Sequence, residues 1–190
     1  MGHGSVHTFV VSLLTISLTA SVANAAEVEQ ASFVGPPAPE ELEVLAPLVG
    51  QWEIHVDVKP SLALKNGYSS NGEATARWIH NGHYLHLDGF ANSASGRFEW
   101  SEIIAYDRNA RQFRRFVFST EGFAAQSVGR WNDKTQTMRW KVVSLPDRWS
   151  GEATTHFGKD SVDFTLLITN DQGKTTRSSS MTMVDKSKVP

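Results

Sequence analysis

Gly50-Gln51-Trp52 opens the first of about ten segments in which polar and apolar residues alternate. From Trp52 to Val58 every second residue is apolar, and Pro60 ends the run. Residues two positions apart lie on one face of a β-strand, so this period predicts a strand with one buried face. A short acidic stretch that favours a helix precedes it, and such a helix followed by many alternating strands indicates a small β-barrel.

Nine further segments show strand patterns separated by turn-forming residues. They cover residues 73–80, 83–88, 97–106, 113–119, 124–131, 138–143, 152–157, 161–169 and 175–184. The strongest turn signal is Asn81-Gly82, because both residues tolerate the positive φ of a two-residue hairpin turn. Short turns between consecutive strands favour antiparallel neighbours. We therefore predict an all-β fold, a single up-and-down antiparallel barrel of about ten strands.

The N-terminus has the pattern of a secretory signal peptide. Residues 9–18 form a mostly apolar run, and Ala23-Asn24-Ala25 supplies the small residues of a cleavage site. The run is shorter than the roughly 20 apolar residues that span a bilayer, so we expect no permanent membrane anchor. We predict that residues 1–25 are removed by cleavage near Ala25 and that the protein is periplasmic or extracellular.

The rest of the chain divides into a tether and one domain. Residues 26–38 combine glutamates, a glycine and prolines without an apolar period, which predicts a flexible tether. Residues 39–190 are predicted to form the barrel domain, which begins with a short helix that Pro47 ends. Three leucines of this stretch are expected to pack against one mouth of the barrel: Leu42, Leu45 and Leu48.

Composition excludes several classes of function. The formal net charge of −2 offers no attraction to a phosphate backbone, so no nucleic-acid partner is expected. The chain has no cysteine, which excludes disulfides, thiolate metal ligands and a cysteine nucleophile. The sequence carries no nucleophile elbow, phosphate-binding loop or zinc-protease motif. We therefore assign no catalytic residue, no cofactor and no oligomeric state.

Three histidines within seven residues are candidate metal ligands, because imidazole binds zinc, copper, nickel and iron. A turn at Asn81-Gly82 places His80 opposite His83 and directs His86 to the other face, which disfavours a three-histidine site. The alternative is a histidine pair completed by a distant ligand such as His156. We expect a solvated pair and no metal.

Glu102 lies in a strand face that is otherwise apolar, where an unpaired carboxylate would be costly. If Tyr106 lies opposite Phe113, Glu102 becomes a diagonal neighbour of Arg115. We predict that Glu102 and Arg115 form an interior pair that orients the head group of an amphipathic ligand, with Trp100 and Tyr106 beside it. The alternative is a pair that faces solvent or only neutralises itself in the core.

Tyr84 and His86 form another candidate group, since a histidine beside a phenol can donate, accept or relay protons. That role requires their face to point inward, whereas the opposite face of the hairpin is more apolar and is the expected interior. The candidate ligand-binding residues are therefore Trp100, Glu102, Tyr106, Arg115, Tyr84 and His86.

Five short motifs lie between residues 39 and 184: Gly50-Gln51-Trp52, Ala76-Arg77-Trp78, Asn81-Gly82-His83-Tyr84-Leu85, Tyr106-Asp107 and Gly129-Arg130-Trp131. In these the chain resembles a bacterial secreted domain-of-unknown-function family with lipocalin-like, calycin-type barrels. The resemblance implies a lipocalin-like or fatty-acid-binding-protein-like barrel and brings no catalytic set. The chain is also similar in plan to the haem-binding nitrobindins, but no haem-ligand motif matches residue by residue.

The expected function is a secreted or periplasmic protein that holds a small, largely apolar or amphipathic molecule in the barrel cavity. The first alternative is a cavity enzyme of isomerase or cyclase type, in which one acid or base moves a proton. The second is a structural envelope protein whose barrel is filled by its own side chains. Cavity size distinguishes the filled barrel, and inward-facing titratable groups distinguish the enzyme.

Overall fold

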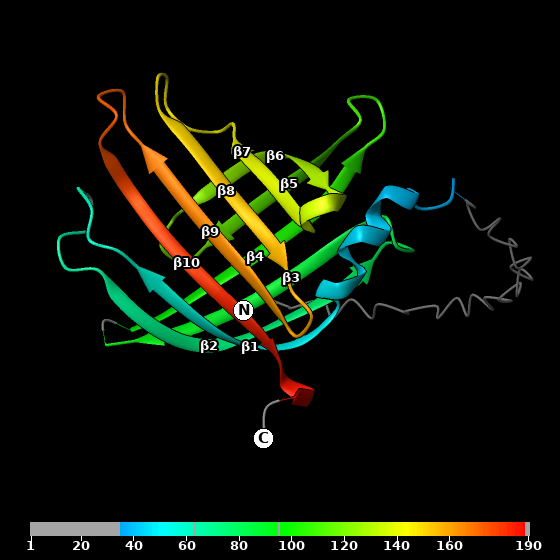
Figure 1. Ribbon diagram of the computed structural model, residues 1–190, viewed down its shortest axis with the longest axis horizontal. Coiled ribbons are helices and arrows are strands. Elements are labelled where there is room, and N and C mark those ends of the chain that lie inside the picture. The colour runs from blue at the N-terminus through cyan, green and yellow to red at the C-terminus, as the bar shows by residue number, and fades with distance from the viewer. Residues whose placement is uncertain (1–34, 63, 95, 189–190) are drawn as a thin grey trace, which may run out of the picture. The chain divides into compact units, whose positions relative to one another are not determined.

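The computed structural model describes residues 35–62, 64–94 and 96–188. The strands are β1 (Gly50–Val58), β2 (Tyr68–Ile79), β3 (Tyr84–Ser93), β4 (Gly96–Asp107), β5 (Gln112–Ser119), β6 (Ala124–Asn132), β7 (Thr137–Val142), β8 (Ser150–Phe157), β9 (Ser161–Thr169) and β10 (Thr175–Asp185) (Figure 1). The 3-10 helices are η1 (Glu40–Leu48), η2 (Asp133–Thr135) and η3 (Lys186–Lys188). Within these ranges no helix is both long and apolar enough to cross a membrane. The predicted signal peptide and most of the predicted tether lie outside the described residues.

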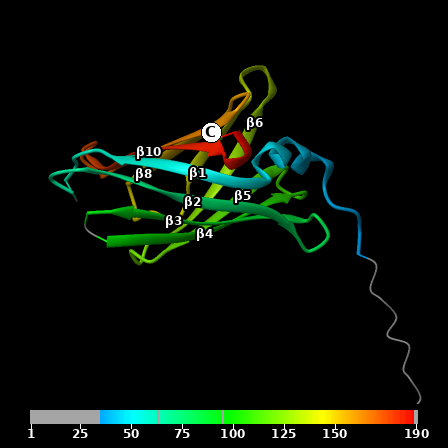
Figure 2. The same ribbon diagram turned by 90° about the horizontal axis from the view of Figure 1, so that it is seen from below.

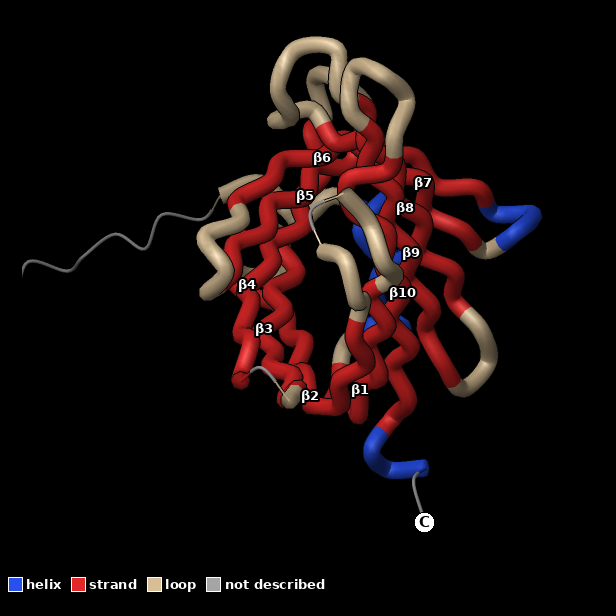
Figure 3. The backbone as a smooth tube through the Cα atoms, turned by 90° about the vertical axis from the view of Figure 1, so that its left-hand side faces the viewer, coloured by secondary structure: helices blue, strands red, loops and turns tan. Residues whose placement is uncertain are grey.

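The ten strands form a closed barrel in which each strand pairs antiparallel with its neighbours in sequence. β1 completes the ring by pairing with β10, where Trp52 lies opposite Asp185 and Val58 opposite Ser179. Figure 3 shows the strands arranged around this ring. The predicted all-β, up-and-down antiparallel barrel is confirmed. Closure matters because it leaves no unpaired sheet edge and turns one face of every strand inward.

The strand order separates the turns into two groups. The turns after β2, β4, β6 and β8 lie at the end of the barrel that carries η1, which we call the closed end (Figures 1 and 2). The turns after β1, β3, β5, β7 and β9 lie at the other end, which we call the open end. The two ends are therefore built from different parts of the sequence.

The predicted hairpin at Asn81-Gly82 is confirmed. Ile79 lies opposite Tyr84, and the His83 N–H donates to the His80 carbonyl at 3.2 Å. Two strands are longer than predicted, since β2 begins at residue 68 instead of 73 and β3 continues to 93 instead of 88. A glycine interrupts the alternation in each extension, at 72 and 89, so the period of two is lost there although the backbone pairing continues.

η1 buries its leucines at the closed end. Leu42, Leu45 and Leu48 are at most 4% exposed and belong to the barrel core, and each burial stabilises the fold by about 1.5–3 kcal/mol. The indole N–H of Trp52 donates to the Leu48 carbonyl at 2.8 Å, which ties η1 to β1. The expectation that Pro47 ends the helix is wrong, because Pro47 lies inside η1. A proline in a helix removes its own backbone N–H as a hydrogen-bond donor. The burial of Leu48 and its hydrogen bond with Trp52 stabilise the last turn of η1.

Two glycines make room for tryptophan rings against the barrel wall. Gly89 lies opposite Trp100, and Gly129 lies opposite Trp140. A Cβ atom on Gly89 would be 2.4 Å from the outer atoms of the Trp100 ring, and one on Gly129 would be 2.5 Å from the Trp140 ring. Each ring therefore occupies the space that a side chain on the opposing strand would fill.

We expect Gly89→Ala to lower the free energy of unfolding by about 1–3 kcal/mol, because the added methyl forces the Trp100 ring to move. Trp100→Phe removes the ring atoms that the methyl would meet, so the double variant should lose less than the sum of the two single losses. Urea denaturation of the four proteins measures this coupling. Strictly additive losses would show that the ring and the glycine are independent.

Asp107 organises the turn between β4 and β5. Its Oδ1 atom accepts the N–H groups of Asn109 and Ala110 at 3.1 and 3.0 Å, and its Oδ2 atom accepts from Arg114 Nη2 at 3.0 Å. The hydrogen bond from the Ala110 N–H, followed by the one from Arg114, holds the pKa of the Asp107 carboxyl below its ordinary 3.8. The ionised form therefore stabilises the fold above the unfolded pKa, and this stabilisation is lost as the pH falls through the folded pKa.

We expect Asp107→Asn to lower the Tm at pH 7 and to approach the wild-type Tm as the pH falls below the ordinary carboxyl pKa, where the ionised form no longer stabilises the wild type fully. Asp171→Asn, at an exposed position in the β9–β10 turn, is the control and should change the Tm little. Thermal melts from pH 7 to 3 make the comparison. A Tm difference between D107N and wild type that stays constant over this range would contradict the assignment.

Candidate functional site

The barrel interior contains a cavity of about 100 Å³ at the open end. The volume exceeds the ~10–15 Å³ that one water needs and is below the ~300–1,000 Å³ of drug-sized sites. The apolar part of its wall includes Val56, Phe98, Trp100, Val117, Phe164 and Met181. Three larger hollows are lined mostly by side chains on the outside of the barrel, on β2–β5, β6–β8 and β8–β10. The interior cavity is the candidate site because it combines enclosure with an apolar wall.

Glu102 and Arg115 form a buried ion pair below this cavity. Arg115 Nε and Nη2 donate to the two carboxylate oxygens of Glu102, each at 2.6 Å, and the Arg115 and Glu102 side chains are 10% and 8% exposed. The register is the predicted one, with Tyr106 opposite Phe113 and Glu102 opposite Val117. A two-pronged contact of this kind satisfies both charges. The interior position and the pairing are confirmed, and the ligand-orienting role stays a prediction.

The ion pair also divides the interior. Arg115 lines both the cavity and a void of about 20 Å³ on the side of η1, whereas Glu102 lines only the void. The guanidinium carbon of Arg115 lies 4.5 Å from the centre of the Phe164 ring and 5.7 Å from that of Trp140. Arg115 is thus held on several sides and forms the floor of the cavity.

We expect Glu102→Leu and Arg115→Met each to lower the free energy of unfolding by about 3–5 kcal/mol, because each leaves one buried charge without its partner. The double variant should be more stable than either single variant, since it buries no charge. Urea denaturation in a double-mutant cycle gives the coupling energy. Single losses below about 1 kcal/mol would place the pair in a solvent-exposed setting instead.

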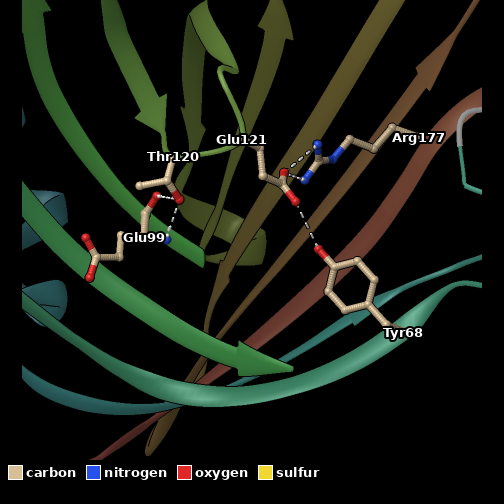
Figure 4. A network of polar contacts seen from close by, with 5 residues as sticks. All are labelled: Tyr68, Glu99, Thr120, Glu121 and Arg177. Carbon is tan, nitrogen blue, oxygen red and sulfur yellow. Dashed lines mark hydrogen bonds and ion pairs between the residues drawn. The ribbon is translucent and has the colours of Figure 1, made fainter. Parts of the chain in front are cut away.

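A second polar contact lies at the mouth of the cavity. Glu121, in the turn between β5 and β6, accepts the Tyr68 hydroxyl through Oε1 at 3.4 Å and both Nη atoms of Arg177 through Oε2 at 3.3 and 3.2 Å (Figure 4). Burial, and then the Glu121 carboxylate, raise the pKa of the Tyr68 phenol above its ordinary 10.0, so Tyr68 remains a donor. Through the Glu121 side chain, the turn between β5 and β6 is therefore linked to β2 and β10.

Of the predicted site residues, Trp100 lines the cavity and Tyr106 does not. Tyr106 is four residues from Glu102, which is about 13 Å along a strand, in the direction of the closed end. There its ring meets Phe113 edge to face, with centroids 5.2 Å apart. Burial, and then a hydrogen bond with Glu41 of η1, raise the pKa of its phenol. Tyr106 therefore lies at the closed end, beside η1, and not at the cavity.

Tyr84 and His86 lie on the outer face of β3, because Leu85 and Leu87 are the buried residues of this strand. Tyr84 is 39% exposed. His86 Nδ1 contacts Arg77 Nη2 at 3.1 Å, and its Nε2 contacts Ser101 Oγ at 2.9 Å and Asp88 Oδ1 at 3.1 Å. Neither residue lines the cavity.

The His86 contacts resemble a Ser-His-Asp arrangement, but the proton is in the wrong place for one. Arginine has only donors, so Nδ1 of His86 accepts from Arg77 and the ring N–H is on Nε2. A histidine that activates a serine needs an unprotonated nitrogen toward the hydroxyl. His86 therefore donates to Ser101 or Asp88 and does not act as a base on Ser101 in this arrangement.

In the described ranges, no group of three or more His, Asp or Glu side chains is placed to hold a metal ion. The His83 ring donates from Nε2 to the Pro36 carbonyl at 2.9 Å, and the His80 ring lies 5.7 Å from that of Tyr84. His156 is on β8, opposite Asp163 of β9. The two turn histidines thus have contacts near the closed end, away from the cavity.

Sequence reasoning missed Arg177, Glu121 and Ser119. Arg177 follows a shift in register between β9 and β10, and it faces inward in alternation with Ser179, Met181 and Met183. This period of two was visible in the sequence. Ser119 shows the same signal, since it ends β5 in alternation with Arg115 and Val117. Glu121 had none, because it is a turn residue that reaches its partners across the barrel mouth and not along a strand.

Fold and cavity together define a closed, ten-stranded antiparallel β-barrel with an interior cavity. Residues 38–183 match the family described as "Protein of unknown function (DUF1579)", and the chain belongs to this family. No curated protein matches the chain.

Among solved structures, the chain is similar to Rv2717c from M. tuberculosis, at 10% identity and a TM-score of 0.60, over 78% of this chain and 99% of that one. This similarity supports the barrel fold. The chain also matches a de novo designed fluorescence-activating β-barrel, at 15% identity and a TM-score of 0.39, over 74% of this chain and 95% of that one.

Proposed function

We propose that this protein binds a small, largely apolar or amphipathic molecule inside a lipocalin-like barrel, through the open end. The observation that carries the proposal is the interior cavity, with an apolar wall, a neutralised floor and a mouth held by one turn. Burial of apolar ligand surface would supply the affinity. The apolar run at residues 9–18 supports secretion to the periplasm or the cell exterior as the setting.

Binding is favoured over proton-transfer chemistry by the nature of the cavity wall. The titratable residues among the described lining are Tyr68, Arg115 and Arg177. Arginine stays protonated, and the raised pKa of Tyr68 keeps it neutral near pH 7. Isomerase or cyclase chemistry needs a group that gives or takes a proton near the working pH. The described lining does not supply one.

Native mass spectrometry of the full chain, purified from the organism that carries it, tests the proposal. We expect a small molecule to remain bound to the wild type. Ala125→Phe should abolish this adduct, because Ala125 lines the cavity and a phenyl ring would fill it. The matched control is Ala124→Phe, the same change at the adjacent exposed position, which should retain the adduct.

The same spectra report whether residues 1–25 have been removed. An adduct that persists in A125F would place binding outside the barrel. The carrier function is wrong if the wild type carries no adduct and, in addition, shows no heat of binding with hexanol, hexanamide or hexanoate.

A further inference from the structure

Two buried polar atoms in the described residues have no hydrogen-bond partner, Ser119 Oγ and Arg177 Nε. Both residues line the cavity, and both adjoin Phe123. The Arg177 guanidinium carbon lies 5.4 Å from the Phe123 ring centre, and the Ser119 N–H donates to the Phe123 carbonyl at 2.9 Å. Buried donors are normally satisfied, so an unused hydroxyl and an unused N–H at one cavity mouth indicate a missing acceptor.

Arg177 is only partly used by its present partner. Its Nη1 and Nη2 atoms both meet a single oxygen of Glu121, at 3.3 and 3.2 Å. A guanidinium pairs best with a carboxylate when two parallel N–H groups meet two different oxygens, at about 2.7–2.9 Å. Glu102 and Arg115 show that geometry in the same barrel, at 2.6 Å. The edge formed by Nε and one Nη atom of Arg177 is therefore open to a better acceptor.

Glu121 is suited to being displaced. It lies in the exposed turn between β5 and β6, and its side chain is 39% exposed. Exposed ion pairs with long contacts contribute little to stability, so an exchange of partners on Arg177 costs little. The position that Glu121 occupies is also informative, because it shows that a carboxylate is accepted between Arg177 and Tyr68.

We propose that the ligand is a small monocarboxylate, whose carboxylate binds Nε and one Nη atom of Arg177 and the Ser119 hydroxyl, so that Arg177 exchanges its contact with Glu121 for one with the ligand. Its apolar part lies in the cavity toward Trp100, Phe164 and Met181. Arg115 does not bind the ligand carboxylate, because its Nε and Nη2 atoms already donate to the two carboxylate oxygens of Glu102. The inference rests on the proposed carrier function and names its ligand class.

Calorimetric titration with hexanoate and with hexanamide tests the inference. The two probes have the same chain and similar shape, and only hexanoate is charged. We expect wild type to bind hexanoate more tightly than hexanamide. Arg177→Met should weaken hexanoate binding about tenfold or more, because it removes a charge-assisted hydrogen bond, and should leave hexanamide binding within about twofold.

Glu121→Gln should strengthen hexanoate binding several-fold, because the competing carboxylate is gone and the charge of Arg177 is unopposed. This gain cannot arise from misfolding, so it keeps the test decisive if R177M folds poorly. The matched controls are Arg97→Met and Glu99→Gln, which alter an ion pair of the same composition that is about half exposed on β4. Both should leave the two affinities unchanged.

The outcomes separate the two proposals. Equal binding of hexanoate and hexanamide, or weaker hexanoate binding in E121Q, overturns the carboxylate inference and leaves the carrier function standing. Binding of neither probe to wild type overturns the inference and removes support from the carrier function as well. Hexanoate binding that R97M weakens as much as R177M does would show a general charge effect and would also overturn it.

Discussion

The pairing of β1 with β10 is the contact on which the rest of the barrel depends. It fixes the circumference of the ring, and the circumference decides how much of the interior the inward-facing side chains can fill. Large rings at Trp52, Trp100 and Trp140 fill much of the space, and glycines opposite two of them let the wall approach closely. The remaining hollow is a consequence of where small residues such as Ala125 and Ser127 face inward.

Along the barrel axis the interior changes from sealed to accessible. At one end η1 and its three leucines complete the core. In the middle the Glu102–Arg115 pair satisfies its own charges and presents a neutral floor. At the other end polar groups of β2, β10 and the β5–β6 turn meet around the mouth. A molecule that enters would therefore contact charged side chains first and apolar side chains afterwards, which suits an amphipathic ligand.

Sequence patterns predicted the strands and one interior contact, and the limits have a physical reason. The period of two and the Asn81-Gly82 turn were enough for the barrel and the hairpin register. They also placed Glu102 beside Arg115, because that contact is between adjacent strands. Tyr106 was assigned to the cavity because a strand pattern indicates the face of a residue but not its height in the barrel. The Arg177–Glu121 contact spans the mouth, and no local pattern encodes it.

The strand order also has a kinetic consequence. Nine of the ten strand pairings join neighbours in sequence, so each can form as a local hairpin, whereas β1 and β10 are separated by almost the whole domain. Loop-closure entropy opposes such a distant contact until the intervening hairpins shorten the effective loop. The pairing of the first and last strands is therefore the natural last step of folding. Until that step is complete, the chain has two unpaired strand edges, on β1 and β10, which can pair with another molecule and aggregate.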